Sequence, residues 1–280
     1  MVAVFVMFMG LTIFAMFTGT VSAFMVERLR VEDRQVDCEQ LSNHVVICGW
    51  SSKGRIIIAE LRASAQAATT PIVVIASPRV DEVDRERNVF WLEDDFTRVA
   101  ALEKAGIQTA STCIVLSDTS AGRNEQDADA RTILAALTVE KLNPAVYTCA
   151  ELLNETYASH LQMGKVNDYV VSSEYGANLL AQAAMSRGLL GVYGELLTYR
   201  HGNEMQRVHV SDQWAGRTFQ EMLGEVKRSH DAILVAVVDS AGVLKVNPPE
   251  HTFAAGEEVI VITRDELNFR SGRNGRNGRK

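Results

Sequence analysis

The chain has 280 residues, long enough for two domains, and 47% of them are hydrophobic, which is sufficient for a buried core. A formal net charge of −7 argues against nucleic acid as a partner of the protein as a whole. No C-x-x-C pair occurs, so neither a zinc site nor a disulfide framework is indicated, and reduced cytosolic thiols are the plain interpretation of Cys38, Cys48, Cys113 and Cys149.

The first 26 residues contain no charged side chain. At about 1.5 Å per residue they cover a hydrocarbon core of about 30 Å, so we expect a transmembrane helix over 1–26. A cleaved signal peptide fits less well, because no basic residue precedes the apolar run and the run is too long. Arg28, Arg30 and Arg34 follow at once, which predicts a cytoplasmic location for everything after the helix. Residues 27–43 form a charged linker.

Beyond the linker, short apolar strands alternate with helices. We predict strands over 44–48, 71–76, 89–92, 112–116, 145–150 and 168–171, and helices from the first strand to about 68 and over 80–87, 97–105, 125–142 and 151–163. Such alternation is typical of an α/β fold with a doubly wound parallel sheet, here a Rossmann-like nucleotide-binding domain over 44–172. In the helix over 125–142, the spacing of Ala130, Ile133, Leu134 and Leu137 predicts one buried face.

The second half of the chain has a different pattern. Residues 173–197 are predicted to form a helical crossover, either one helix or two helices joined near Gly188. Strands over 205–210, 233–238, 243–246 and 259–263, with one helix over 218–226, predict a small α+β domain over 198–266. Residues 267–280, rich in Gly, Arg and Asn, are expected to form a disordered basic tail, contact with anionic lipid being the alternative.

The stretch from His44 to Leu61 has the order strand, tight turn, helix, which is where parallel α/β sheets bind phosphate. Gly49 and Gly54 match the outer glycines of the fingerprint G-x-G-x-x-G, but Ser51 holds the middle position. The Cβ of Ser51 hinders close approach of a pyrophosphate, although its hydroxyl can donate to one. The alternative is a plain strand-to-helix turn without a ligand.

Polar residues follow the other strands at the same edge of the sheet. Ser77 stands where an acidic residue would bind a ribose, and Arg79 either meets a phosphate or is a surface residue. Asp95 either caps the next helix or faces the adenine end of a nucleotide. Asp118 ends the fourth strand and Glu151 the fifth. Several carboxylates converging on the Gly49 crevice favour a binding site over isolated caps.

No catalytic set is recognisable, so we do not expect an enzyme. None of the six histidines belongs to a recognisable catalytic motif with an acidic partner, and neither a nucleophile elbow nor zinc-ligand spacing occurs. Glu257, Glu258 and Asp231 are candidates for a divalent cation, but a solvated turn is the favoured interpretation. The metal content is therefore left unknown.

Four motifs in order resemble the RCK (regulator of K+ conductance) family: HVVICGW at 44–50, NEQDADARTILAALTVEKLNP at 124–144, AELL at 150–153 and NPPEHTFAAGEEVIVI at 247–262. The resemblance is strongest to prokaryotic RCK-gated potassium channels, with TrkA-N-like and TrkA-C-like lobes. It implies a tetrameric K+ pore pulled by a cytoplasmic ring of eight RCK domains. The crossover over 173–197 would build the RCK dimer.

The resemblance also implies roles for individual residues. The phosphate turn comprises Gly49, Trp50, Ser51, Ser52 and Gly54. Ser77 matches the ribose position, Asp95 the contact after the third strand and Asp118 the end of the fourth. Glu151 matches a carboxylate that contacts a nucleotide or calcium in relatives. The calcium-gated members have a second carboxylate where this chain has Leu153, which argues against the same calcium site.

The expected function is that of a ligand-sensing gating-ring subunit of a potassium channel, with NAD or an adenine nucleotide (ADP or ATP) as regulatory ligand and calcium or another divalent cation as a further candidate. No TVGYG-like filter precedes the first helix, so the filter is expected upstream in a longer chain or in full-length partner subunits. A regulatory subunit of a Trk-, Ktr- or Kef-like transport system is the alternative. A membrane-anchored NAD(P)-dependent oxidoreductase is a third possibility, which lacks an acid/base pair.

Overall fold

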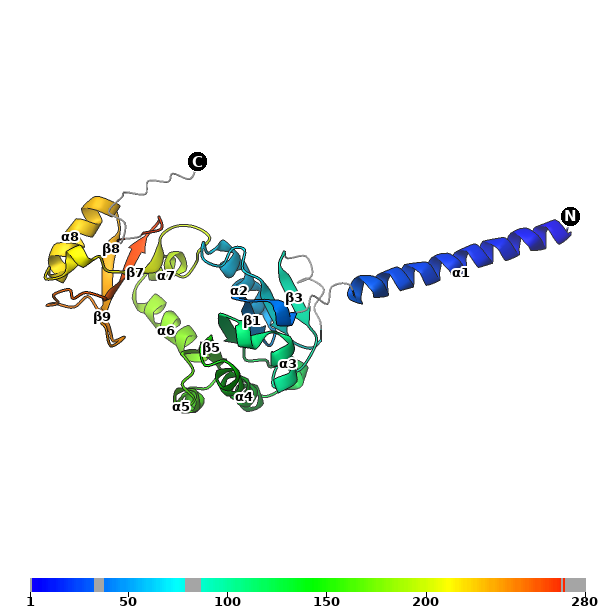
Figure 1. Cartoon of the computed structure of the whole chain (residues 1–280), viewed down its shortest axis with the longest axis horizontal. Helices are drawn as coiled ribbons and strands as arrows, with labels where there is room; N and C mark the ends of the chain where they lie inside the picture. Colours follow the sequence, from blue (N-terminus) through cyan, green and yellow to red (C-terminus); the bar gives the residue numbers. More distant parts are fainter. Residues whose placement is uncertain (1, 33–37, 79–86, 268, 270–280) are drawn as a thin grey trace. The chain divides into compact units, whose positions relative to one another are not determined.

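A computed structural model of the chain describes residues 2–32, 38–78, 87–267 and 269 (Figure 1). The chain divides into two compact units. The first unit comprises Met1–Ile57 and Thr69–Gly176, and the second comprises Ile58–Ala68 and Ala177–Lys280. Arg79, the predicted helix over 80–87 except its last residue, part of the linker and most of the basic tail lie outside the described residues.

The first helix, α1, runs over Val2–Glu32, the blue helix at the N-terminus in Figure 1. It therefore continues past the predicted boundary at residue 26 into the charged linker. Among the residues that the structure describes, no helix has both the length and the apolar character needed to cross a membrane. The predicted transmembrane segment over 1–26 is thus not supported by the structure.

The first unit is built on a six-stranded sheet with the order β3-β2-β1-β4-β5-β6, in which neighbouring strands are parallel. The predicted parallel α/β sheet is thereby confirmed. Since the order reverses between β1 and β4, this point is the topological switch of the sheet. The strands are β1 (Val45–Cys48), β2 (Ile72–Ile75), β3 (Val89–Leu92), β4 (Thr112–Val115), β5 (Tyr147–Leu152) and β6 (Asp168–Val171).

Both faces of the central strands are covered, and every residue of β1 and β2 is buried. This is why these strands read as continuous apolar runs instead of alternating ones. The associated helices are α2 (Ser52–Ala63), α3 (Val99–Lys104), α4 (Glu125–Leu142) and α5 (Ala158–Met163), with 3-10 turns η1 (Cys38–Gln40), η3 (Ile107–Thr109), η4 (Ser120–Gly122) and η5 (Glu155–Tyr157).

The buried face of α4 differs from the predicted one. Leu134 is 53% exposed, and Ala130 is exposed as well. The buried residues are small or polar: Ala128, Asp129, Thr132, Ala135, Ala136 and Val139. Ile133 and Leu137 pack beside them as partly buried residues. The spacing of hydrophobic residues predicted the wrong buried face of α4. Small residues let the helix approach the sheet closely, so they occupy the contact, while the larger apolar residues lie beside it.

The predicted helix over 151–163 is wrong in its first half. Strand β5 continues to Leu152, so Glu151 is a strand residue that pairs with Val170 of β6. A 3-10 turn, η5, and then α5 follow. Apolar residues at 150, 152 and 153 are compatible with either state, and the pairing with β6 decides for the strand.

The second unit contains the crossover and a four-stranded sheet. The crossover consists of α6 (Ser172–Met185), whose first residues belong to the first unit, and α7 (Leu189–Leu196), with the break at Gly188, where φ is +87°. The sheet has the order β7-β10-β8-β9 with antiparallel pairs. Its strands are β7 (Glu204–His209), β8 (Ile233–Val238), β9 (Leu244–Val246) and β10 (Glu258–Thr263).

One helix, α8 (Phe219–His230), packs against β8, preceded by the 3-10 turn η6 (Asp212–Trp214). Thr218 and Glu221 form a reciprocal capping box that fixes the start of α8. Phe269 lies within the predicted disordered tail over 267–280 but is buried against Trp214, so the prediction of disorder is wrong at this residue. The small α+β architecture predicted for this part of the chain is therefore present.

Candidate functional site

The turn after β1 is built around Gly49. Its φ of +84° lies in the left-handed region that glycine adopts without strain. A Cβ at this position would lie 2.9 Å from the backbone oxygen of Leu116 and would also meet Phe96 and Asp118. The chain thus passes closely against the end of β4 at the topological switch, where ligands of open α/β sheets bind.

Helix α2 starts directly after this turn, at Ser52, and has no acidic residue in its first turn. The N–H of Gly54 donates to the Ser51 carbonyl at 3.0 Å, and the N–H of Lys53 donates to Ser51 Oγ at 3.3 Å. The positive end of the helix dipole and the first-turn N–H groups favour an anion at such a position. Binding of a phosphate at this turn stays a prediction.

Gly54 has a different role from the one its place in the fingerprint indicates. A Cβ on Gly54 would lie 2.6 Å from two ring atoms of Trp50. The Trp50 indole in turn meets Trp91 of β3 edge to face, with ring centroids 5.3 Å apart. An aromatic pair of this kind contributes about 0.5–1.5 kcal/mol beyond its buried area. Gly54 therefore makes room for Trp50, which holds the turn.

Asp95 lies in the turn after β3. Its Oδ1 accepts hydrogen bonds from the N–H and the hydroxyl of Thr97, at 2.9 and 2.8 Å, and from Arg131 Nη2 at 2.7 Å. Partial burial raises the pKa of Asp95, but these hydrogen bonds outweigh it and the pKa is lowered. The N-cap of α3 is Arg98, without a side-chain hydrogen bond, so the alternative that Asp95 caps this helix is wrong.

Asp118 is buried beyond the end of β4. It accepts a hydrogen bond from the N–H of Ser120 at 2.8 Å and forms an ion pair with Arg123, in which Nη1 lies 3.0 Å from Oδ2. Arg123 also approaches Asp127 of α4 at 3.8 Å. Asp118 therefore neighbours Gly49 but has its charge compensated within its own loop.

Glu151 is buried at the carboxyl end of β5. Its Oε1 accepts hydrogen bonds from Lys53 Nζ and Ser172 Oγ, and its Oε2 accepts one from the N–H of Ser117 at 3.3 Å. These partners come from α2, from the start of α6 and from the end of β4. Glu151 thus links the phosphate turn to two neighbouring strand ends.

The two candidates after β2 have less structural support. Ser77 is exposed directly beyond β2, where it is accessible to a ligand. Arg79 lies outside the described residues, so its predicted contact with a phosphate stays a prediction. The same holds for the contacts of Ser52 and Ser77 with a nucleotide.

Asp129 was not predicted as a site residue, yet it is the carboxylate that organises this edge of the sheet. It is fully buried on α4 and accepts hydrogen bonds from Ser117 Oγ at 3.2 Å and from the N–H groups of Leu153 and Asn154, both at 2.9 Å. It thereby connects the loops after β4 and β5. The sequence did hold one signal for this role, because Asp129 stands between two alanines of a helix that packs on a sheet.

Each predicted carboxylate of the site is paired with a basic residue that the sequence did not single out: Asp95 with Arg131, Asp118 with Arg123, and Glu151 with Lys53. Only Lys53 had a recognisable signal, since a cation in the first turn of a helix opposes the helix dipole. The three pairs place a basic group beside each predicted carboxylate at this edge of the sheet.

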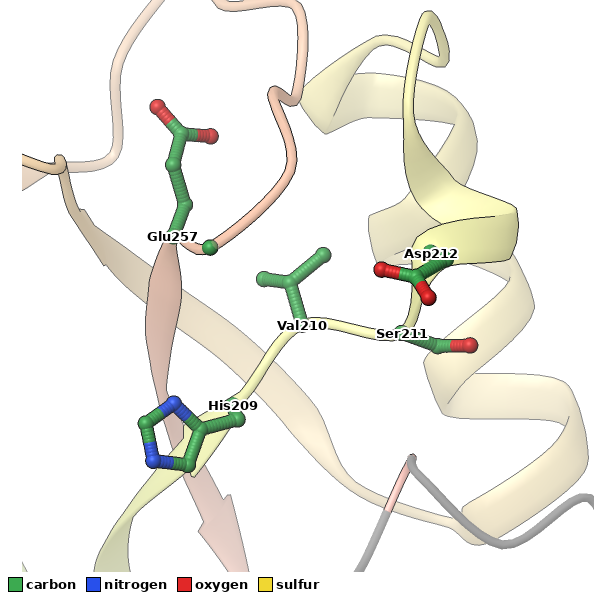
Figure 2. A pocket seen from close by; sticks show the side chains of 6 residues that line it. His209, Val210, Ser211, Asp212 and Glu257 are labelled. Carbon is green, nitrogen blue, oxygen red and sulfur yellow. The ribbon is translucent and has the colours of Figure 1, made fainter.

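The second unit has a shallow hollow of about 420 Å³, lined by His209, Val210, Ser211, Asp212, Gly256 and Glu257. Figure 2 shows that the polar ends of His209, Ser211 and Glu257 point in different directions. The carboxylate of Glu257 is held by His251 Nε2 and by the N–H of Ala254, both at 3.0 Å. The hollow therefore lacks converging groups that would hold a ligand.

The other candidate cation ligands are paired as well. Glu258 forms an ion pair with Arg207 and lies 3.2 Å from His209 Nδ1, and Asp231 forms an ion pair with Lys227. Within the described part of the chain, no group of three or more His, Cys, Asp or Glu side chains is arranged to hold a metal ion. The solvated-turn interpretation holds for Asp231, whose side chain is 91% exposed. It is wrong for Glu257, which is buried, and for Glu258, which begins β10.

Two family models match different parts of the chain. Residues 40–150 match the family described as the calcium-activated potassium channel slowpoke-like RCK domain, and residues 174–274 match the family described as Castor and Pollux, part of voltage-gated ion channel. The first match begins just before β1 and ends within β5, so it includes Gly49, Asp95 and Asp118 but not Glu151. The second begins in α6 and includes the four-stranded sheet.

Individual relatives are also ion channels. The chain is 26% identical over 268 residues to the calcium-gated potassium channel TvoK of Thermoplasma volcanium, covering 95% of this chain and 74% of TvoK. It is 27% identical over 287 residues to the ion channel POLLUX of Lotus japonicus, covering 94% of this chain and 30% of POLLUX. The chain thus spans about three quarters of one relative and less than a third of the other.

A solved structure shows the same fold. The human SLO3 gating ring superposes with a TM-score of 0.63 at 15% sequence identity, covering 79% of this chain and 44% of that one. At this level of identity the likeness concerns the fold alone. Together with the family matches, it confirms the resemblance that the four sequence motifs predicted.

Proposed function

This chain carries an RCK domain of the potassium-channel type, and we propose that it is the ligand-sensing subunit of a gating ring that controls K+ conduction. The proposed site is the Gly49 crevice, and the proposed ligand is NAD or an adenine nucleotide. The observation that carries the proposal is the absence of space for a Cβ at Gly49, directly before a helix whose first turn has no acidic residue.

A divalent cation is the second candidate ligand, because TvoK is named a calcium-gated channel. Glu151 would be its ligand in this chain, and Leu153 stands where calcium-gated relatives are expected to have a second carboxylate. Glu151 is already neutralised by Lys53, and in the described residues no three-ligand group suits a metal. These facts favour the nucleotide over the cation.

The crossover supports assembly with a second copy of the chain. Neither α6 nor α7 has a buried residue, and large apolar side chains on them are exposed, among them Leu180 at 72% and Met185 at 86%. Exposed apolar helices of this kind mark protein–protein contacts. We therefore propose an RCK dimer through 173–197, further assembled into an octameric ring with full-length, pore-bearing subunits on the cytoplasmic side of the cell membrane.

The mechanism requires no chemistry on the ligand. A ligand shifts a gate only by as much as its affinity differs between the two gate conformations, typically about 1–3 kcal/mol per coupled site. Several sites in one ring add their contributions. The chain is thus proposed as a regulator and not as an oxidoreductase, in line with its ion-channel relatives.

Binding measurements with the purified full chain test the proposal. Isothermal titration calorimetry with NAD, ADP, ATP and CaCl2 should detect at least one nucleotide that binds without turnover, while the mass from light scattering should be a multiple of the chain mass. Hydride transfer from NADH or NADPH to an acceptor would support the oxidoreductase instead. A monomer that binds none of the nucleotides would refute the proposal.

A further inference from the structure

Lys53 lies in an unusual place. It is in the first turn of α2, where a cation opposes the helix dipole, so an anion nearby is needed to compensate it. In the described structure that anion is Glu151, whose Oε1 contacts Lys53 Nζ. The Lys53 side chain is 47% exposed and that of Glu151 only 8%. The ammonium group can therefore move into solvent, whereas the carboxylate cannot.

Glu151 has further donors that stay when Lys53 leaves. Ser172 Oγ donates to the same oxygen as Lys53, and the N–H of Ser117 donates to the other at 3.3 Å. Burying a carboxylate without hydrogen bonds costs free energy, but these two neutral donors still stabilise Glu151 in part. The ion pair is thus one of two arrangements that this cluster can support.

We propose that Lys53 exchanges between Glu151 and the phosphate of a bound nucleotide, so that Glu151 acts as a competitor of the ligand and lowers its affinity. The inference rests on the proposed nucleotide site and names the residues that set the affinity of that site. It differs from the role implied for Glu151 by resemblance, in which the carboxylate contacts the ligand.

The exchange also reaches the crossover. Ser172 is the first residue of α6, and its hydroxyl contacts both Glu151 Oε1 and, at 3.4 Å, Lys53 Nζ. When Lys53 moves from Glu151 to a phosphate, the hydrogen bond from Ser172 provides a larger part of the stabilisation of the Glu151 carboxylate. The start of α6 is therefore held differently in the free and the bound state.

Four variants of the full chain test the proposal by calorimetry with ADP, inorganic pyrophosphate and adenosine. Lys53→Met should weaken binding of ADP and pyrophosphate roughly tenfold, because a charged hydrogen bond is lost. Glu151→Gln should tighten both roughly three- to tenfold. Ser172→Ala should weaken both about threefold, since Glu151 then needs Lys53 more, and this effect should vanish in the double variant of Glu151→Gln with Ser172→Ala. Adenosine, which has no phosphate, should not respond.

Matched controls carry the same chemical change elsewhere in the first unit. Lys141→Met, in the last turn of α4, and Glu103→Gln, in α3, are exposed and should leave all affinities unchanged. Circular dichroism melting checks that each variant is folded.

The outcomes separate the inference from the function on which it rests. Weaker ADP binding by Glu151→Gln, or an equal effect of Ser172→Ala with and without the Glu151 carboxylate, would overturn the exchange while leaving the nucleotide site intact. Failure of both the native chain and Glu151→Gln to bind any nucleotide or pyrophosphate would instead refute the nucleotide site itself.

Discussion

Replacing Asp129 should destabilise the first unit more than any other single change of a charge in α4. The side chain is fully buried and accepts three hydrogen bonds, from Ser117 Oγ and from the N–H groups of Leu153 and Asn154. Asp129→Ala leaves all three donors without their acceptor. Asp129→Asn keeps one oxygen but points an NH2 group at the remaining donor.

The expected costs follow from these contacts. An unsatisfied buried donor costs about 1–3 kcal/mol, and a hydrogen bond to a charged group contributes about 1.5–3 kcal/mol. Oδ1 of Asp129 serves two donors and Oδ2 serves one, so Asp129→Asn loses one bond and should cost about 2–3 kcal/mol. Asp129→Ala loses all three and should cost about 3–5 kcal/mol, less than the full sum because water can enter.

Urea unfolding followed by tryptophan fluorescence measures these costs. Trp50 and Trp91 report on the first unit, and a Trp214→Phe background removes the signal of the second. Asp127→Asn is the matched control, because Asp127 lies one half turn away on α4 with a side chain 54% exposed, and it should cost less than about 1 kcal/mol. If both Asp129 variants unfold at the same urea concentration as Asp127→Asn, the structural role derived for this carboxylate is refuted.

Three further perturbations have defined outcomes. Burial lowers the pKa of His44, so the free energy of unfolding should be highest above the unfolded pKa of about 6.5 and should decrease as the pH drops below it. In the His44→Gln variant the urea midpoint should therefore vary less between pH 7.5 and 5.5 than in the native chain, and an equal pH dependence would contradict this. Gly49→Ala should cost more than Gly122→Ala, because both have positive φ but only Gly49 lacks space for a Cβ; equal melting points would exclude the close approach. Glu60→Gln should speed hydrogen exchange of the Tyr199 amide, which donates to Glu60 at 2.9 Å, and unaltered exchange would show that this bond is not protective.

The strand order could be predicted closely because hydrophobic runs and their breaks are local properties of the chain. The strands over 89–92 and 168–171 and the helix over 125–142 have the predicted bounds. The prediction was wrong for residues whose side chains are compatible with both a helix and a strand. Glu151 and Leu152 were assigned to a helix, whereas pairing with β6, a contact distant in sequence, extends the strand.

The sequence predicted the backbone turn of the site, but not which basic residues pair with its carboxylates. Gly49 was identified because a strand followed by glycine and a helix is visible in sequence. The partner of Asp95 is Arg131, and that of Glu151 is Lys53, which is distant along the chain. Such pairs are set by tertiary packing, so a sequence pattern gives the candidates and only the fold shows which charges neutralise each other.

Potassium flux is the most direct test of the claim that the Gly49 crevice controls a gate. The chain would be reconstituted into proteoliposomes together with full-length pore-bearing subunits, and K+ efflux measured with and without ADP or NAD. We expect the nucleotide to change the flux with the native chain and to have no effect with Gly49→Ala. Equal flux with and without nucleotide in the native complex, although the nucleotide is bound, would contradict the account.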